Sequence, residues 1–268
     1  ILFKIYTIVY GSFDKIIHYF ARHEQGAAHE ADGYARVSGK VGVCLATSGP
    51  GATNLVTGIM TAHMDSVPML AITGQVKSNL LGKDAFQETD IVGITVPITK
   101  MNYLVQDIKE IPRIIKEAYF IASTGRPGPV LVDIPNDIQL QEISYDEFDK
   151  LYNKKIVLEG YDPTYVGHQG QIKRSLELIK NAKKPLVIAG AGVLKAKASK
   201  ELFEFVEKTN TPVAMTLLGL GSFPGRHELS LGMLGMHGTV SANYAIDEAD
   251  LIIAAGIRFD DRITGDPN

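Results

Sequence analysis

The feature that most constrains this chain is a repeated unit, in which a short apolar run ends in glycine and a helical pattern follows. Val41–Thr47 leads into the Ser-Gly-Pro-Gly turn of residues 48–51, and Pro185–Ala189 leads into Gly190-Ala191-Gly192. Leu251–Ala255 ends at a glycine in the same way. Apolar runs of this length that alternate with helical segments predict parallel strands joined by crossover helices. We therefore expect an α/β protein with two doubly wound, mostly parallel-sheet domains.

Hydrophobic periodicity places further elements along the chain. Helices are expected near residues 1–10 (with a strand as the alternative), 25–37, 54–64, 107–123, 169–181, 196–208 and 239–248. Strands are expected near residues 16–21, 41–47, 68–73, 99–105, 130–134, 185–189, 212–216 and 251–255. Between residues 136 and 166 the periodicity fails and the share of charged residues rises, which is typical of a surface linker. We expect a first domain over residues 1–135, a linker over 136–166 and a second domain over 167–268.

Composition excludes several classes of protein. The formal net charge is −3, without the basic excess of nucleic-acid-binding proteins, and no apolar run approaches the roughly 20 residues that span a bilayer. The single cysteine, Cys44, lies in an apolar run and is expected to be a buried, reduced thiol of a cytoplasmic protein. The chain starts without Met and shows no signal peptide, and we expect both of its ends to be cuts.

Glu24 is the first candidate for chemistry. It follows the predicted strand at 16–21 and precedes an alanine-rich helix. In open α/β sheets, ligands bind outside the carboxyl ends of the strands, so a carboxylate placed there is a candidate for proton transfer. The alternative is an acid at a helix start, favoured by the helix dipole. This stretch alone favours the alternative.

Metal and serine chemistry find no support in these motifs. A zinc-binding helix needs two histidines four residues apart, whereas His29 follows His23 by six residues and would lie about 240° further round the helix at ~100° per residue. A serine nucleophile elbow needs glycine two residues before the serine, and Ala46 occupies that position before Ser48. The glycines of residues 48–51 have two interpretations: they allow a ligand to approach the backbone closely, or they form a tight turn that lets the following helix pack on the strand.

The second half offers weaker signals. Gly190-Ala191-Gly192 follows a strand, as in dinucleotide-binding turns, but Lys195 occupies the position of the third glycine. Arg258 and Asp260 follow the last predicted strand and form either a surface ion pair or ligand contacts. Met236 and its neighbours are equally consistent with core filling.

Six motifs, taken together, resemble one family. They are RHEQGAAHEADGYARVSGKVGV, TSGPGATN, GKDAFQETDIVGIT, GRPGPVLVDIP, LGMHGT and GIRFDDR. In content and order they are similar to the catalytic subunit of acetohydroxyacid synthase (acetolactate synthase), a thiamine-diphosphate enzyme. The resemblance extends from about Ile1 to Gly265 and implies a pyrimidine-binding fold followed by a Rossmann-like central domain. Pyruvate oxidase and 2-oxo acid decarboxylases are similar in fold, and the FQETD and MHGT motifs favour the synthase.

The resemblance implies an activity and its cofactors. Pyruvate would be decarboxylated and joined to a second 2-oxo acid, giving 2-acetolactate or 2-aceto-2-hydroxybutyrate in branched-chain amino-acid biosynthesis. Thiamine diphosphate, Mg²⁺ and FAD are the implied cofactors. Members of this family form homodimers or tetramers, with a small regulatory subunit as a further partner, and no nucleic-acid or membrane partner is expected. Mg²⁺ and the diphosphate are bound by a C-terminal domain absent from this sequence, so we expect the chain alone to be inactive.

The resemblance also implies roles for individual residues. Glu24 matches the glutamate that hydrogen-bonds N1′ of the aminopyrimidine, and Pro50 and Asn54 match the loop beside it. Gln87 is the second catalytic candidate, and Phe86 lies at the mouth of the substrate channel. The FAD contacts implied by the resemblance are Arg126, Gly190, Ala191, Gly192, Met236, His237, Gly238, Thr239, Gly256, Arg258 and Asp260.

The chain departs from the family pattern at particular places. The family's Gly-Gly loop over the active site would precede residue 1. Asn136 stands where the family usually has lysine, which removes a positive charge that could attract an anionic 2-oxo acid. A truncated, non-catalytic flavin-binding module therefore remains the alternative function.

Overall fold

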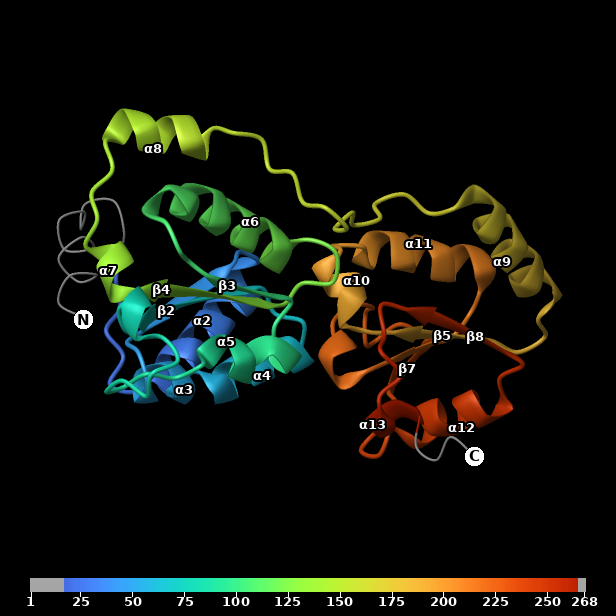
Figure 1. Cartoon of the computed structure of the whole chain (residues 1–268). Coiled ribbons are helices and arrows are strands. Elements are labelled where there is room, and N and C mark those ends of the chain that lie inside the picture. The colour runs from blue at the N-terminus through green and yellow to red at the C-terminus, as the bar shows by residue number, and fades with distance from the viewer. Residues whose placement is uncertain (1–16, 265–268) are drawn as a thin grey trace. The chain divides into compact units, whose positions relative to one another are not determined.

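The chain divides into two compact units, residues 1–164 and 165–268. The structure is a computed structural model that describes residues 17–264, and each unit is described below by itself (Figure 1). The helix predicted over residues 1–10 lies outside the described residues. Within them, no helix combines the length and the apolar character needed to cross a membrane.

The first unit is built on a four-stranded parallel sheet in the order β1-β2-β4-β3. Its strands are β1 (Gly42–Ala46), β2 (Met69–Gln75), β3 (Met101–Leu104) and β4 (Pro129–Pro135). Its α-helices are α2 (Glu24–Ser38), α3 (Pro50–Asn54), α4 (Val56–Met64), α5 (Ile91–Thr95), α6 (Ile111–Ser123), α7 (Asn136–Gln139) and α8 (Tyr145–Tyr152). Helices α2 to α5 cover one face of the sheet, and α6 covers the other (Figure 1). The unit therefore has three layers.

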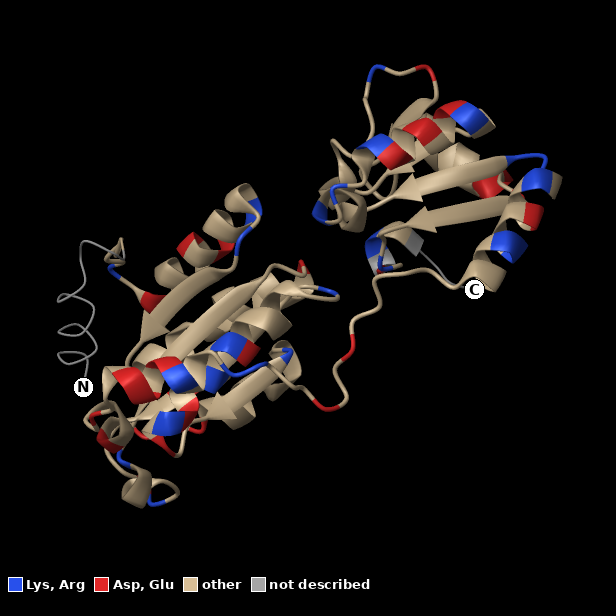
Figure 2. Ribbon diagram, turned by 90° about the horizontal axis from the view of Figure 1, so that it is seen from above, with Lys and Arg blue, Asp and Glu red and all other residues tan. Residues whose placement is uncertain are grey.

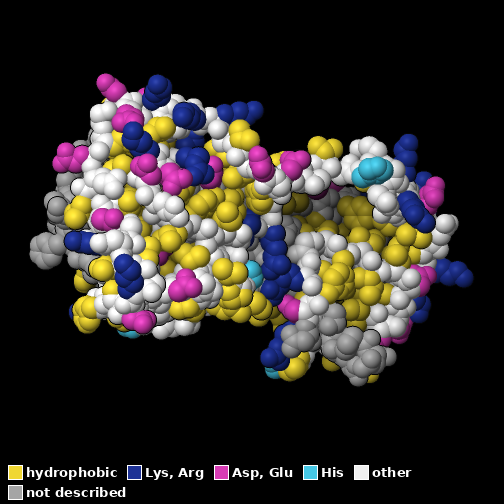
Figure 3. All heavy atoms as spheres, in the orientation of Figure 1, with side chains coloured by type: hydrophobic (Ala, Val, Ile, Leu, Met, Phe, Trp, Pro, Cys, Tyr) yellow, Lys and Arg dark blue, Asp and Glu magenta, His cyan; other side chains and the backbone are white. Residues whose placement is uncertain are grey.

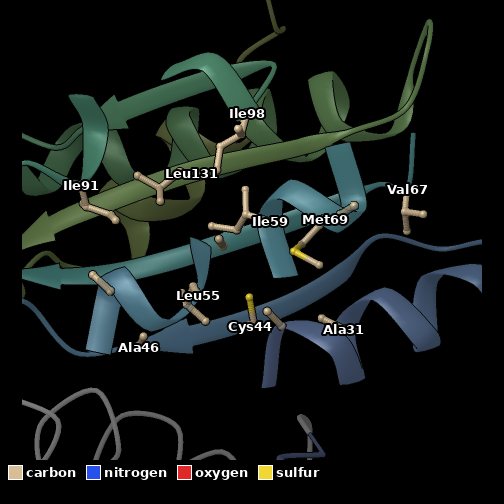
Figure 4. Packing of buried hydrophobic residues seen from close by; sticks show 14 of the residues in the cluster. Ala31, Cys44, Ala46, Leu55, Ile59, Val67, Met69, Ile91, Ile98 and Leu131 are labelled. Carbon is tan, nitrogen blue, oxygen red and sulfur yellow. The ribbon is translucent and has the colours of Figure 1, made fainter. Parts of the chain in front are cut away.

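Strand periodicity explains the two cores of this unit. Alternate side chains of a strand point to opposite faces, so Leu131 packs toward α2, α4 and α5 while Val130 and Val132 pack toward α6. Cys44 on β1 belongs to the first of these cores and is buried beside Ala31 and Leu55 (Figure 4). Burial raises the pKa of the Cys44 thiol to about 12. The thiol is therefore a neutral part of the core.

The second unit repeats the plan with strands β5 (Pro185–Ala189), β6 (Val213–Met215), β7 (Ser230–Met233) and β8 (Leu251–Ala255) in the order β7-β6-β5-β8. Its helices are α9 (Gln169–Asn181), α10 (Ala191–Lys195), α11 (Ser199–Thr209), α12 (Val240–Glu248) and α13 (Asp261–Thr264). The chain runs outward from β5 to β7 and then returns to place β8 on the other side of β5. The strand order therefore reverses between β5 and β8, at the position where open α/β sheets bind ligands.

Charge is confined mainly to helices and loops. Figure 2 shows most Lys, Arg, Asp and Glu on the helices and connections, with the strands largely free of them. On the face of the first unit visible in Figure 3, side chains of both signs are interspersed. This distribution agrees with buried parallel sheets, whose strands are apolar on both faces.

The structure confirms the predicted doubly wound α/β class and corrects several elements. Residues 17–21, predicted as part of a strand, form none, and Ile17, Tyr19 and Phe20 are highly exposed. Strand propensity depends on pairing with a neighbouring strand and on burial of one face, and these three side chains are exposed instead. Strand β7 was not predicted, because its sequence Ser-Leu-Gly-Met lies within a glycine-rich stretch.

The segment 136–166, which we interpret as a linker, contains helices α7 and α8. Its Tyr161 hydroxyl hydrogen-bonds Lys100 Nζ at 3.0 Å and donates to the Thr124 carbonyl oxygen at 2.9 Å. Lys100 directly precedes β3, and Thr124 ends α6. This part of the segment is thereby bound to the first unit.

Candidate functional site

Glu24 and Asn54 meet at the carboxyl edge of the first sheet. Helix α2 begins at Glu24, where His23 caps it by accepting a hydrogen bond from the backbone N–H of Gln25 at 3.1 Å. The Asn54 amide, at the end of α3, donates a hydrogen bond to Glu24 Oε2 at 3.1 Å. Among the described residues, none donates a hydrogen bond to Glu24 Oε1. The carboxylate is partly exposed, so this second oxygen can accept a hydrogen bond from a ligand.

The turn of residues 48–51 lies beside that carboxylate. Gly49 has φ +63°, a conformation that L side chains rarely adopt. A Cβ at Gly51 would lie 2.6 Å from Thr47 Cγ2 and 3.3 Å from Glu24 Oε1, so only glycine lets the turn come this close. Pro50 is at the first position of α3, where its missing N–H costs no hydrogen bond.

A second turn, residues 82–88, reaches the first one through Gln87. Gln87 has φ +60°, and its carbonyl oxygen would lie 2.8 Å from a Cβ at Gly49. The neighbouring Phe86 is 89% exposed. The structure therefore brings Glu24, Asn54, the 48–51 turn and Gln87 together, with Phe86 at the surface next to them.

Glu88 organises this second turn. Its carboxylate accepts hydrogen bonds from the backbone N–H groups of Ala85 at 2.9 Å and Lys83 at 3.3 Å, and from that of Gly82. Hydrogen bonds to the ionised form hold the pKa of Glu88 below its usual value, with the bond from Ala85 as the largest cause. The acidic residue of the FQETD motif therefore has a structural role in the turn.

Three polar residues that were not among the predicted site residues form a hydrogen-bonded cluster on β2 and β4. Thr73 Oγ1 donates to Asp133 Oδ1 at 2.7 Å, and Gln75 Nε2 donates to Asp133 Oδ2 at 3.0 Å. All three are buried, and burial raises the pKa of Asp133 to about 6 despite these two bonds. Polar side chains interrupt apolar strands near their carboxyl ends in the sequence, but no periodic pattern singled them out.

Arg126 and Asn136 lie at opposite edges of the sheet. Arg126 precedes β4 and so lies at the amino edge of the sheet, where its Nε donates to Ser66 Oγ at 2.7 Å. It is therefore not close to Glu24. Asn136 begins α7 directly after β4, at the carboxyl edge. The next residue, Asp137, accepts hydrogen bonds from the backbone N–H and the hydroxyl of Ser78 at 2.8 and 3.0 Å.

In the second unit, three glycines at the β5–β8 switch point pack on one another. A Cβ at Gly190 would lie 2.4 Å from the carbonyl oxygen of Gly256, and one at Gly192 would lie 2.6 Å from Gly256 Cα. The N–H of Gly192 donates to the same carbonyl oxygen at 3.0 Å. Backbone packing therefore requires these glycines, with Ala191 between them, independently of any ligand.

Side chains around this switch point are available to a ligand. Met236 is 69% exposed, and His237 beside it is exposed as well, on the segment after β7. Arg258 Nη2 donates to Asp260 Oδ2 at 3.0 Å after β8. Thr239 has a structural role, since its hydroxyl accepts the backbone N–H of Ala242 and caps α12. Gly238 packs against Met233 and Leu234, where a Cβ would lie 2.5 Å from a carbonyl oxygen.

No group of three or more His, Cys, Asp or Glu side chains suitable for a metal ion occurs within residues 17–264. The carboxylates near the site, Glu24, Glu88 and Asp133, are each engaged by hydrogen-bond donors.

Two family models match the chain. The N-terminal TPP binding domain of thiamine pyrophosphate enzymes matches residues 6–94, and the central domain of thiamine pyrophosphate enzymes matches residues 172–268. Together they cover the Glu24 site and the glycine turns of the second unit.

Curated relatives match over nearly the whole chain. The acetolactate synthase large subunit of Corynebacterium glutamicum is 56% identical over 262 residues, which are 98% of this chain and 41% of that protein. The probable acetolactate synthase large subunit of Methanococcus aeolicus is 55% identical over 251 residues, 94% of this chain and 42% of that protein. The chain thus spans about two fifths of the length of these relatives.

Proposed function

The chain belongs to the thiamine pyrophosphate enzymes, whose N-terminal and central domains it carries, and we propose that it acts as part of an acetolactate synthase large subunit. The reaction joins pyruvate, after its decarboxylation, to a second 2-oxo acid. The products are 2-acetolactate or 2-aceto-2-hydroxybutyrate, precursors in branched-chain amino-acid biosynthesis.

The observation that carries this proposal is the contact between Glu24 and Asn54. These residues are 30 positions apart in sequence, and the hydrogen bond between their side chains fixes the carboxylate at the carboxyl edge of the sheet. One oxygen faces Asn54, and the other lies beside the Gly51 backbone. A helix-start acid with only a dipole role would need neither neighbour.

The donor set fits the aminopyrimidine ring of thiamine diphosphate. Glu24 Oε1 accepts no hydrogen bond from a described residue and can accept one from a ring nitrogen, and Gly51 keeps the turn close to this oxygen without a side chain of its own. The cofactor supplies the carbanion chemistry by which a 2-oxo acid is decarboxylated and a carbon–carbon bond is formed. Glu24 holds and polarises the ring, Asn54 orients Glu24, and Pro50 shapes the turn. Gln87 and Phe86 contact the substrate.

FAD is part of the proposal for the second unit, without a net redox role. Support comes from the switch point between β5 and β8 and from the exposed side chains of Met236 and His237 near it. Arg258 supplies a cation there, held by Asp260. The glycines at 190, 192 and 256 contribute by keeping the backbone close. Arg126 is kept as an FAD contact on the resemblance alone.

The remaining partners belong to the same proposal. We assign Mg²⁺ and the diphosphate to the part of the relatives that this chain does not match. The relatives are named large subunits, which supports an oligomer with a smaller regulatory partner. The free, buried Cys44 is consistent with a reducing cytoplasm.

Replacing Glu24 tests the proposed function. In the protein expressed from its complete reading frame, Glu24→Gln keeps the shape of the side chain but removes its charge. We expect the rate of acetolactate formation from pyruvate to fall by about 100-fold. The matched control is Glu30→Gln, an exposed glutamate of the same helix, which should leave the rate unchanged. An unchanged rate in Glu24→Gln would remove Glu24 from the mechanism.

The same preparation separates the synthase from a pyruvate oxidase. Anaerobic mixing with pyruvate leaves the flavin oxidised through many turnovers of a synthase. Flavin bleaching in step with turnover would identify an oxidase instead.

A further inference from the structure

The segment that carries Phe86 and Gln87 is anchored at both ends to residues of the sheet edge. At its start, Ser78 donates two hydrogen bonds to Asp137, which follows β4. At its end, the carbonyl oxygen of Thr89 accepts a hydrogen bond from Gln75 Nε2 at 2.7 Å. Between these anchors the segment lies on the protein surface.

Between its anchors, the turn is internally braced. Three of its residues, Gly82, Asp84 and Gln87, have positive φ values, and the Glu88 carboxylate gathers three backbone N–H groups. A turn braced in this way moves as one piece. Its direction relative to the sheet is therefore set by the anchors rather than by its own flexibility.

The anchor at Gln75 has no freedom to reorient. Its Nε2 lies between two acceptors, Asp133 Oδ2 at 3.0 Å and the Thr89 carbonyl oxygen at 2.7 Å, and its Oε1 accepts the backbone N–H of Val76 at 2.8 Å. A flipped amide would place its oxygen against both acceptors. Asp133 also accepts a hydrogen bond from Thr73 on the neighbouring strand, through its other oxygen, Oδ1.

We propose that Gln75 is a positioning residue for the 2-oxo acid substrate, acting through Thr89 on the turn that presents Phe86 and Gln87. The buried Asp133 fixes the Gln75 amide, the amide fixes the end of the turn, and the turn packs Gln87 against Gly49. The part of this inference that concerns the substrate rests on the proposed function. The part that concerns the turn rests on the described contacts alone.

A tryptophan reporter tests the turn directly. The chain contains no Trp, so Phe86→Trp places a single fluorophore on the turn. In this background, Gln75→Met preserves the length of the side chain and removes both donated hydrogen bonds. We expect the anisotropy decay of the introduced tryptophan to gain a fast nanosecond component. Gln75→Leu, which also lacks the donor and adds no charge beside Asp133, is the second variant should Gln75→Met fail to fold.

The matched control is Thr73→Val. Thr73 also donates to Asp133 but does not contact the turn, and valine has nearly the same shape. We expect Thr73→Val to leave the anisotropy decay unchanged. An unchanged decay in Gln75→Met would overturn the inference, because the hydrogen bond from Gln75 to Thr89 would then not hold the turn. Equal loosening in Thr73→Val would overturn it as well, because any disturbance of the buried polar residues would then have the same effect.

Steady-state kinetics separate the effect on substrate binding from the effect on the turn. They are measured on the protein expressed from its complete reading frame, with Phe86 retained. Gln75→Met should raise KM for pyruvate about tenfold with kcat largely kept, because a misdirected turn weakens substrate capture without altering Glu24. Thr73→Val should leave both constants unchanged. A wild-type protein that forms no acetolactate would overturn the proposed function. An active wild type with an unchanged KM in Gln75→Met would overturn this inference alone.

Discussion

The two units share a sheet plan but differ in the last row of residues before the carboxyl edge. In the first unit this row contains Thr73 and Asp133, both polar and buried. In the second unit the corresponding row is Met233, Met215, Ala189 and Ala255, which are all apolar. One edge therefore holds its loops by side-chain hydrogen bonds, and the other has no side chain in this row that could do so.

In the second unit, glycine packing takes the place of these side-chain hydrogen bonds. Gly190 and Gly256 replace side-chain anchors by backbone packing at the switch point. In the first unit, Gly51 approaches side chains, Thr47 and Glu24, that belong to the candidate site. Two glycine turns that look alike in sequence are thus required for different reasons, and substitutions can separate these reasons.

The largest effect is expected at Gly256. Gly256→Ala forces a Cβ within 2.6 Å of Gly192 Cα at a residue with φ +65°. Backbone atoms on both sides cannot yield, so we expect the second unit to lose about 4 kcal/mol from overpacking and left-handed strain together. Urea unfolding followed by circular dichroism measures this loss. Gly225→Ala, with open space around its Cβ, should change stability by less than about 0.5 kcal/mol. Equal losses at both positions would contradict the packing argument.

The next largest effect is expected in the pH dependence of stability, which reports on the buried Asp133 of the first unit. Burial raises the pKa of Asp133 to about 6, with Asp90 as a nearby like charge, so between pH 4 and 6 the folded state binds this proton more tightly than the unfolded state. The resulting stabilisation is complete below about pH 4 and is lost as pH rises through about 6. The difference between the folded and unfolded pKa of Asp133 corresponds to about 3 kcal/mol.

Asp133→Asn removes this titration. Its amide can still accept from Gln75 and donate to the Thr73 hydroxyl, so the fold should persist. The difference in unfolding free energy between wild type and Asp133→Asn should therefore change by up to about 3 kcal/mol between pH 4 and 7. Parallel stability curves for the two proteins would show that Asp133 does not titrate in this range.

The smallest effect is expected at Gly51. Gly51→Ala brings a Cβ within 2.6 Å of Thr47 Cγ2, but this is a side-chain atom and the residue lies in a helix at ordinary φ. The gain in helix propensity offsets part of the overpacking, and we expect a loss of about 1 kcal/mol. Displacement of Glu24 should reduce activity more than stability. A loss as large as that of Gly256→Ala would erase the proposed difference between the two turns.

Much of the fold could be predicted from local pattern. Strands β5 and β8 and helix α9 have the predicted bounds, because each combines a clear period with a sharp boundary signal. The helix predicted over residues 196–208 is α11, which begins three residues later at Ser199, and the short helix α10 on the glycines that follow β5 was not predicted. The sequence shows that a glycine lies in a turn, but it does not show which part of the backbone packs against that glycine in the fold.

The site was less accessible from sequence. The sequence marked Glu24 as a candidate site residue. Its hydrogen bond with Asn54 could not be predicted from local pattern, because only the fold brings these two residues together. The resemblance placed both residues beside the same ring, whereas spacing alone left Glu24 as a helix-start acid. Gln75 and Asp133 were missed because each lies within a predicted strand or at its end, where a single polar residue carries no periodic signal.

The buried thiol of Cys44 has a practical consequence. A neutral thiol inside the core does not react with maleimide reagents at ordinary pH, and the sequence contains no second cysteine. A cysteine introduced at an exposed position of each unit can therefore carry a spin label or a dye without removal of the native residue. Distances between two such labels would establish how the two units are arranged in solution.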